Sequence, residues 1–168
     1  MRKTIAAVTI HVAILVLVLA PPLWVRATGT EAYLETQKMD PRSLFRGHYV
    51  ILGYKVAQNI VPDHRPTTPG TGNNTVYVKF STVRPAKFLS VSDKPPSLAL
   101  GEACIVGRKR GRGGAVDFPQ IAQFFAPPDE ARQLEGRRSM NLQAQVRTDS
   151  RCNAVLIDLV PPVAIMGE

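Results

Sequence analysis

The segment from Thr4 to Val25 contains no Asp, Glu, Lys or Arg, and it constrains the fold of this chain more than any other feature. A helix that rises about 1.5 Å per residue needs about 20 residues to cross a hydrocarbon core of about 30 Å. The segment is long enough for this. Residues 4–25 are therefore predicted to be a transmembrane anchor in contact with lipid.

A cleaved signal peptide is the main alternative, because its apolar region spans only about 7–15 residues and ends at small residues. The most apolar part, Val12–Ala20, has that length, and Pro21-Pro22 could end it. However, Val25-Arg26-Ala27 is a poor cleavage site, and Trp24 is typical of a residue retained at a membrane interface. The sequence favours a retained anchor over a signal peptide, and both over a buried globular helix.

The charges around this segment predict its orientation. Arg2 and Lys3 precede it directly, and basic residues at the end of a span favour the cytoplasmic side. Residues 1–3 are accordingly predicted to be cytoplasmic, and residues 26–168 to form a domain outside the cytoplasm. The expected protein is a single-pass protein of the inner (plasma) membrane.

The remainder of the chain is long enough for one domain with a single core. Its strand-like segments alternate apolar and polar residues and are separated by turn residues, with no βαβ alternation. The fold is predicted to be mainly β: a small antiparallel barrel or sandwich with one or two short helices. The predicted strands are 32–37, 49–57, 76–82, 86–92, 102–108, 115–126, 141–148 and 153–160. A flexible loop is predicted at about 58–75 and a short helix at 130–138.

The two cysteines, Cys104 and Cys152, leave two interpretations open. An exported domain permits a disulfide, and both residues lie in or near predicted strands. Two buried free thiols fit equally well. Their spacing is not that of a zinc site, so no metal and no cofactor are predicted.

Residues 40–54 have the sequence DPRSLFRGHYVILGY, which resembles the signature of the GDYXXLXY family of membrane-anchored bacterial proteins. His48 departs from the signature, which has Asp at this position. The resemblance continues through Gly107-Arg108 and residues 123–127 to the C-terminal hairpin, and so covers nearly the whole domain. The residues assigned to the signature are Asp40, Pro41, Arg42, Leu44, Phe45, Arg46, Gly47, His48, Tyr49, Leu52 and Tyr54.

This resemblance implies a single-span anchor with an extracytoplasmic β domain and no defined biochemical activity. It also implies an accessory role beside an integral membrane partner. Where the family has carboxylates, this chain has Ala122, Pro128 and His48, which puts any acid-dependent family role in doubt. The signature itself is predicted to be a structural scaffold, with a binding surface as the alternative.

The sequence predicts no catalytic residue. Ser43 has no lysine with distinguishing context nearby, since Lys79 and Lys87 lie in unrelated strand segments, and His48 and His64 lack metal-ligand spacing.

The most basic segment contains Arg108, Lys109, Arg110 and Arg112. These side chains could contact an anionic surface, although a solvated hairpin turn is the simpler interpretation. No aromatic residues are interleaved for base stacking, so nucleic acid is not an expected partner.

The expected function is therefore that of a non-catalytic accessory or docking protein for an integral membrane or envelope partner. The alternatives are an envelope hydrolase and a periplasmic ligand-binding module with an unrecognised site.

Overall fold

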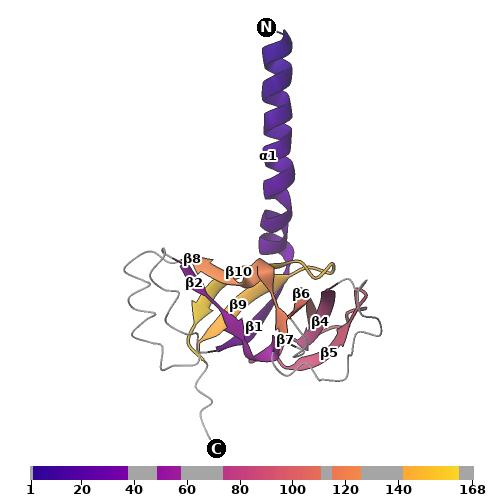
Figure 1. The fold of residues 1–168 in the computed structure, drawn as a ribbon, viewed down its shortest axis with the longest axis vertical. Coiled ribbons are helices and arrows are strands. Elements are labelled where there is room, and N and C mark those ends of the chain that lie inside the picture. The colour runs from indigo at the N-terminus through magenta and orange to yellow at the C-terminus, as the bar shows by residue number, and fades with distance from the viewer. Residues whose placement is uncertain (1, 38–48, 58–73, 111–114, 126–141, 163–168) are drawn as a thin grey trace, which may run out of the picture.

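A long helix stands on one side of a β domain in the computed structural model, which describes residues 2–37, 49–57, 74–110, 115–125 and 142–162 (Figure 1). The helix, α1 (Arg2–Thr28), contains the segment predicted to span the membrane. Its part from Lys3 to Thr28 has a mean hydropathy of 2.4 over the most apolar window, and none of that window is buried. By length and composition, α1 can cross a membrane.

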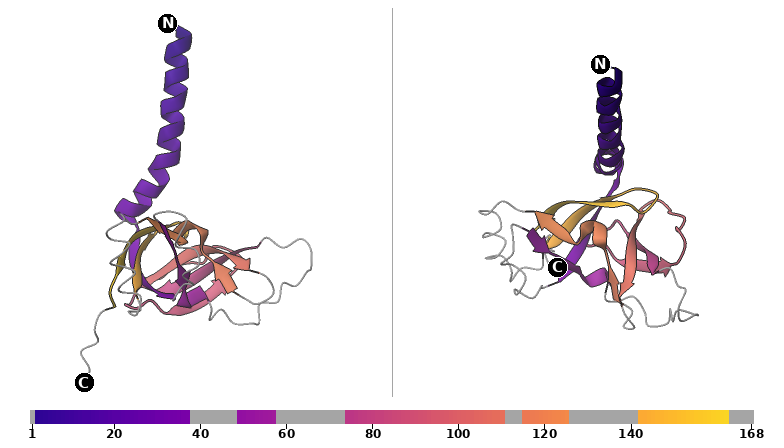
Figure 2. Two further views of the ribbon diagram at one scale, coloured as in Figure 1. Left: turned by 60° about the vertical axis from the view of Figure 1, so that its left-hand side comes forward. Right: turned by 45° about the horizontal axis from the view of Figure 1, so that its top comes forward.

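The two prolines do not end the helix. Pro21 and Pro22 lie inside α1, which bends before it reaches the β domain (Figure 2). A proline inside a helix lacks the N–H that would bond to the preceding turn, and its ring displaces that turn, so it bends the helix. The helix continues beyond the two prolines to Thr28, whose hydroxyl donates to the Trp24 carbonyl at 2.9 Å.

The described residues of the β domain form two four-stranded antiparallel sheets, which are not closed into a barrel. This confirms the predicted mainly β, antiparallel fold; of the two predicted forms, it is compatible with the sandwich and not with the barrel. The first sheet has the order β10-β9-β1-β3, with β10 (Ala154–Val160), β9 (Gln143–Thr148), β1 (Thr30–Gln37) and β3 (Gly53–Tyr54). The second has the order β5-β4-β6-β7, with β5 (Phe88–Ser92), β4 (Thr75–Ser81), β6 (Glu102–Arg110) and β7 (Ala115–Asp117). A separate pair joins β2 (Tyr49–Ile51) to β8 (Gln123–Phe125).

The two large sheets share one hydrophobic core. Leu34 and Val146 enter it from the first sheet, and Phe80 and Ile105 enter it from the second. In β4 the alternation predicted from sequence is confirmed, because alternate residues point into the core. These inward residues are Val76, Val78 and Phe80.

Two of the predicted strands are interrupted. Residues 49–57 were expected to form one strand, but the chain changes partner within it: β2 pairs with β8, and β3 pairs with β1. Between them the Leu52 N–H donates to the Ala122 carbonyl at 2.8 Å, and residues 55–57 form a 3-10 turn, η2 (Lys55–Ala57). The prediction of a single strand was therefore wrong, because long-range pairing overrides the local apolar run.

Residues 115–126 are likewise divided. A 3-10 turn, η3 (Pro119–Ile121), separates β7 from β8, since Pro119 has no N–H to offer a strand ladder. The predicted helix at 130–138 lies outside the described residues. So does the predicted loop at 58–75, apart from its last two residues, of which Thr75 begins β4.

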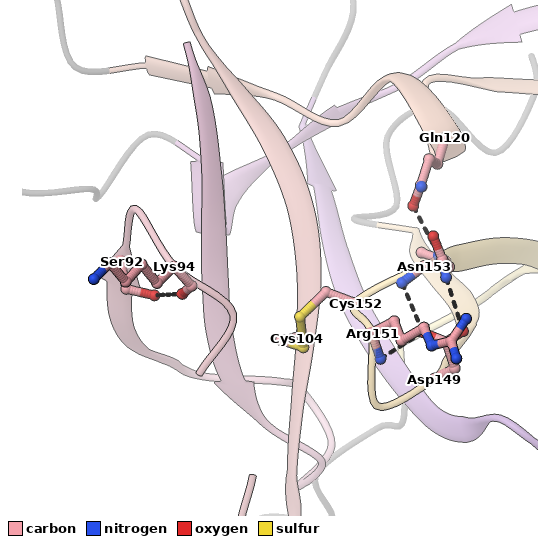
Figure 3. Close-up of a disulfide and its surroundings, with 9 residues drawn as sticks. Ser92, Lys94, Cys104, Gln120, Asp149, Arg151, Cys152 and Asn153 are labelled. Atoms are coloured by element: carbon pink, nitrogen blue, oxygen red, sulfur yellow. Dashed lines mark hydrogen bonds between the residues drawn. A yellow bond between two sulfur atoms is a disulfide. The ribbon is translucent and has the colours of Figure 1, made fainter. Parts of the chain in front are cut away.

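A disulfide between Cys104 and Cys152 connects the two sheets (Figure 3). Cys104 lies in β6, and Cys152 lies in the turn between β9 and β10, with a Cα–Cα distance of 4.8 Å. Both residues are fully buried. The Val106 N–H also donates to the Cys152 carbonyl at 3.0 Å. The turn is thus attached to the second sheet by a covalent bond and a hydrogen bond.

We expect the double substitution Cys104→Ala/Cys152→Ala to lower the free energy of unfolding by about 4 kcal/mol, because a cross-link over this separation restricts the unfolded chain. The two residues are 48 positions apart. Denaturant unfolding of the full-length protein in an uncharged detergent measures the change. A reductant should lower the wild-type midpoint and leave the double variant unaffected. Equal midpoints for the two proteins without reductant would contradict this prediction.

Candidate functional site

The described part of the family signature supports the core. Tyr54 is 4% exposed, and its hydroxyl donates to the Ile121 carbonyl at 2.7 Å. Its ring meets the Phe118 ring edge-on, with centroids 5.8 Å apart. Burial raises the pKa of the Tyr54 hydroxyl well above its ordinary value. These contacts are those of a scaffold residue, since the hydroxyl is already paired within the domain.

Two other signature residues, Leu52 and Tyr49, lie in the same part of the β domain as Tyr54. Leu52 packs partly buried against the core. Tyr49 begins β2, which pairs with β8. The other signature residues lie outside the described residues: Asp40, Pro41, Arg42, Leu44, Phe45, Arg46, Gly47 and His48.

The second notable place is the connection between the apolar helix and the β domain. α1 ends at Thr28 and β1 begins at Thr30, so a single residue, Gly29, separates them. Val25, in the last turns of the helix, is 3% exposed, and its carbonyl accepts a hydrogen bond from the Gly29 N–H at 2.8 Å. The helix and the sheet are therefore in direct contact, and no linker joins them.

Gly29 is required by a close approach of three backbone segments. A Cβ at this position would lie 2.5 Å from the Val25 carbonyl oxygen and 3.0 Å from that of Thr148 in β9. The first distance is shorter than any real contact of a Cβ, and both neighbours are backbone atoms that cannot rotate away. Only glycine allows β9 to pack this closely against the helix end.

Arg147 in β9 strengthens this contact. Its Nη1 donates to the Arg26 carbonyl at 2.6 Å and to the Ala27 carbonyl at 3.4 Å. The last carbonyls of a helix have no partner within the helix and carry partial negative charge, so a cation stabilises them. The Nη2 of Arg147 lies 3.6 Å from Glu31, its cross-strand neighbour in β1.

A chain of polar side chains continues from Glu31 across the outer face of the first sheet. The Tyr33 hydroxyl donates to the Glu31 carboxylate, and the Arg84 guanidinium lies 3.9 Å from the centre of the Tyr33 ring. Arg84 also donates from Nε to Gln143 at 2.8 Å and from Nη2 to the Pro161 carbonyl at 3.1 Å. The network thus extends from the helix end to the far end of β10.

This network shifts two pKa values. The hydrogen bond from Tyr33, assisted by Gln145 and Arg147 and opposed by burial, lowers the pKa of the Glu31 carboxyl. The same hydrogen bond raises the pKa of the Tyr33 hydroxyl, because ionisation would place two negative groups side by side. Both shifts favour a charged Glu31 and a neutral Tyr33. We call the group Val25, Arg26, Gly29, Glu31, Tyr33, Arg147 and Thr148 the helix–sheet junction.

Sequence reasoning did not find the helix–sheet junction. A glycine is a common signal of a helix end, but the predicted helix ended at Val25, whereas the observed helix continues to Thr28 and Gly29 follows it directly. The partners Arg147 and Thr148 are more than 100 residues away in sequence, and their approach depends on the register between β1 and β9.

The described part of the basic segment lies in β6. Arg108 is exposed, whereas Lys109, on the opposite face of the strand, forms an ion pair with Asp93 at 3.0 Å. Arg110 is the last residue of β6, and Arg112 lies outside the described residues. Successive strand residues point to opposite faces, so Arg108 and Lys109 do not share one surface.

The described ranges contain no group of three or more His, Cys, Asp or Glu side chains that could hold a metal ion. Another ion pair, between Lys79 and Glu102 at 3.0 Å, holds the end of β4 to the start of β6. Glu102 also accepts a hydrogen bond from the Ala99 N–H at 2.9 Å, which is the main cause of a lowered pKa of its carboxyl. These contacts hold the segment that leads into β6 against the end of β4.

The chain thus combines an N-terminal helix that can cross a membrane with an antiparallel β domain that follows it directly. The model of the family described as GDYXXLXY protein matches residues 11–159, and the chain belongs to this family. The match covers the helix from His11 onward, the signature segment and every described strand up to Leu159. No curated protein and no solved structure matches the chain.

We expect Tyr54 to make folding sensitive to alkaline pH. Its pKa is raised in the folded state, so its contribution is fully present below the ordinary value of 10.0 and is lost as the pH rises above that value. Tyr54→Phe should lower stability by about 1–2 kcal/mol at neutral pH, since the Ile121 carbonyl loses its donor. Unfolding measured from pH 8 to 11 should show a weaker alkaline decrease for this variant.

Tyr77→Phe provides the matched control, because Tyr77 is only partly buried, on the outer side of β4. This variant should keep the alkaline decrease of the wild type. An unchanged decrease in Tyr54→Phe would show that the buried hydroxyl is not its source.

Proposed function

We propose that this protein is a non-catalytic accessory protein, which holds a β domain at a fixed position against a membrane so that it can bind an integral membrane or envelope partner. The observation that carries the proposal is the helix–sheet junction. A domain that worked independently of the membrane would need only a flexible tether. Here one residue separates α1 from β1, and Val25 and Arg147 hold the helix end against the sheet.

A rigid connection of this kind favours docking. An interface formed by two membrane proteins requires a defined height and rotation of the bound surface, and loss of rotational freedom in advance lowers the entropic cost of binding. The junction supplies both, because the buried Val25 and the Arg147 hydrogen bonds define how the helix end is turned relative to β9.

The proposal also places the β domain outside the cytoplasm, in a single-pass inner-membrane protein that keeps its helix as an anchor. Two features support this. The buried disulfide between Cys104 and Cys152 is of the kind that persists in oxidising compartments. Arg2 and Lys3 precede the helix and favour its N-terminus in the cytoplasm.

We expect the mature protein to keep its helix. Cleavage near Ala27 would remove Val25 and the Arg26 carbonyl, and with them the contacts of the junction. Intact-mass measurement and N-terminal sequencing of protein purified from membranes should give a start at or next to Met1. A mature start near Ala27 or Thr28 would contradict the anchor. Protease added outside spheroplasts should degrade the β domain, and protease added to inside-out vesicles should leave it intact.

We expect partner binding to depend on the rigid junction. Full-length protein should be cross-linked in native membranes and purified, and its partners identified by mass spectrometry. A variant with a flexible Gly-Ser segment of about six residues inserted between Thr28 and Gly29 should remain in the membrane but recover the same partner about tenfold less well.

The matched control carries the same insertion in the turn after β5, between Lys94 and Pro95, which leaves the junction unchanged. Formation of the disulfide and the unfolding midpoint show that both variants fold. If no partner is recovered above background while the protein turns over an envelope substrate, the accessory function is wrong. Equal recovery with both insertions would remove the rigid junction from the proposal.

A further inference from the structure

The turn between β9 and β10 is the part of the hairpin that extends toward the membrane side. Thr148 at the end of β9 pairs with Thr30 at the start of β1 and with Ala154 at the start of β10. β1 leads away from the helix, so its antiparallel neighbour β9 leads back toward it. Residues 149–153 therefore lie at the level where α1 enters the domain, as Figure 1 shows.

If α1 spans a bilayer, this level falls within the headgroup region. Trp24 is 69% exposed on the helix and is of the type that marks the membrane interface. Gly29 follows five residues later, which corresponds to at most about 8 Å along the helix. The headgroup layer on each side of the hydrocarbon core is about 5–8 Å thick. Residues beside Gly29 can thus reach lipid phosphates.

The turn is held rigidly in this position. The Asp149 carboxylate accepts hydrogen bonds from the Arg151 N–H at 2.9 Å and from the backbone and side-chain N–H groups of Asn153, each at 2.8 Å (Figure 3). The disulfide of Cys152 attaches the turn to β6. The side-chain oxygen of Gln120 accepts a hydrogen bond from the Ala154 N–H at 2.8 Å. Little further ordering of the backbone is needed for a side chain of this turn to bind.

Two cations at this level, Arg26 and Arg151, form no ion pair with the described residues. Arg151 is exposed at the tip of the turn, and the Asp149 oxygens are occupied by donors of the turn itself. Arg26 is exposed on the last turn of α1, and its carbonyl, rather than its side chain, takes part in the junction. Guanidinium groups bind phosphate oxygens in a bidentate manner, and this makes arginine well suited to phosphate recognition.

We propose that Arg26 and Arg151 bind the phosphates of anionic phospholipids in the leaflet that faces the β domain. The junction fixes the domain relative to α1, but α1 itself can still tilt and turn as a whole within the bilayer. Headgroup contacts at the turn add a second attachment point and define the orientation of the domain over the membrane. The inference concerns a lipid ligand and does not depend on whether a protein partner exists.

The test uses the full-length protein in nanodiscs with equal amounts of phosphatidylcholine and phosphatidylglycerol. Native mass spectrometry of the released protein measures the ratio of the two retained lipids. The wild type should retain phosphatidylglycerol in preference. Arg26→Gln and Arg151→Gln should each reduce this preference about fivefold, and the double variant more than tenfold, because each basic residue contributes separately near an anionic surface.

Two controls make the result specific. Lys87→Gln removes an exposed positive charge next to β5, which lies on the side of the domain away from α1, and should leave the lipid ratio unchanged (Figure 1). Arg151→Lys keeps the charge and should keep the preference within about threefold. The disulfide and the unfolding midpoint verify folding of each variant. An unchanged ratio in the double variant, or an equal loss in Lys87→Gln, would overturn the proposal. Failure here would leave the cross-linking result for a protein partner unaffected.

Discussion

The close contact between the end of α1 and strand β9 is the constraint on which the arrangement of this protein depends. It requires that residue 29 have no side chain, because a Cβ would collide with the backbone of Val25. Arg147 stabilises this contact by donating hydrogen bonds to the last carbonyls of the helix. As a result, the chain passes from an apolar helix into the central part of a β-sheet within one residue. The direction of the helix and the direction of the sheet cannot vary independently.

The disulfide extends this constraint to the second sheet. The turn at residues 149–153 follows directly from β9, and Cys152 attaches it to Cys104 in β6. The helix end, the first sheet and the second sheet are therefore connected through one hairpin. The same hairpin presents Arg151 at the level of the helix end, so the contacts that stabilise the fold also determine where this charged side chain lies.

The sequence allowed much of the fold to be predicted where local patterns decide the structure. The apolar run of α1, the alternation of Val76, Val78 and Phe80, and the hairpin of β9 and β10 were all identified. The predictions failed where contacts between segments distant in sequence determine the local structure. Residues 49–57 look like one strand because they are rich in β-branched and aromatic residues, but they change partner at Leu52. Of the family signature, Tyr54 could be predicted as structural. The helix–sheet junction could not, because its parts are brought together by strand register.

The sequence by itself determined that this chain has an apolar N-terminal helix capable of spanning a membrane, a mainly β domain behind it and membership of a family defined by a short signature. These properties depend on composition, periodicity and spacing within short windows. Only the tertiary structure decided that the helix is joined directly to the domain, that Cys104 and Cys152 are bonded and that the segments of Arg26 and Arg151 lie at the same end of the first sheet. The reason is physical. Pairing between β1 and β9 joins residues more than 100 positions apart, and the local sequence pattern does not specify the register of that pairing.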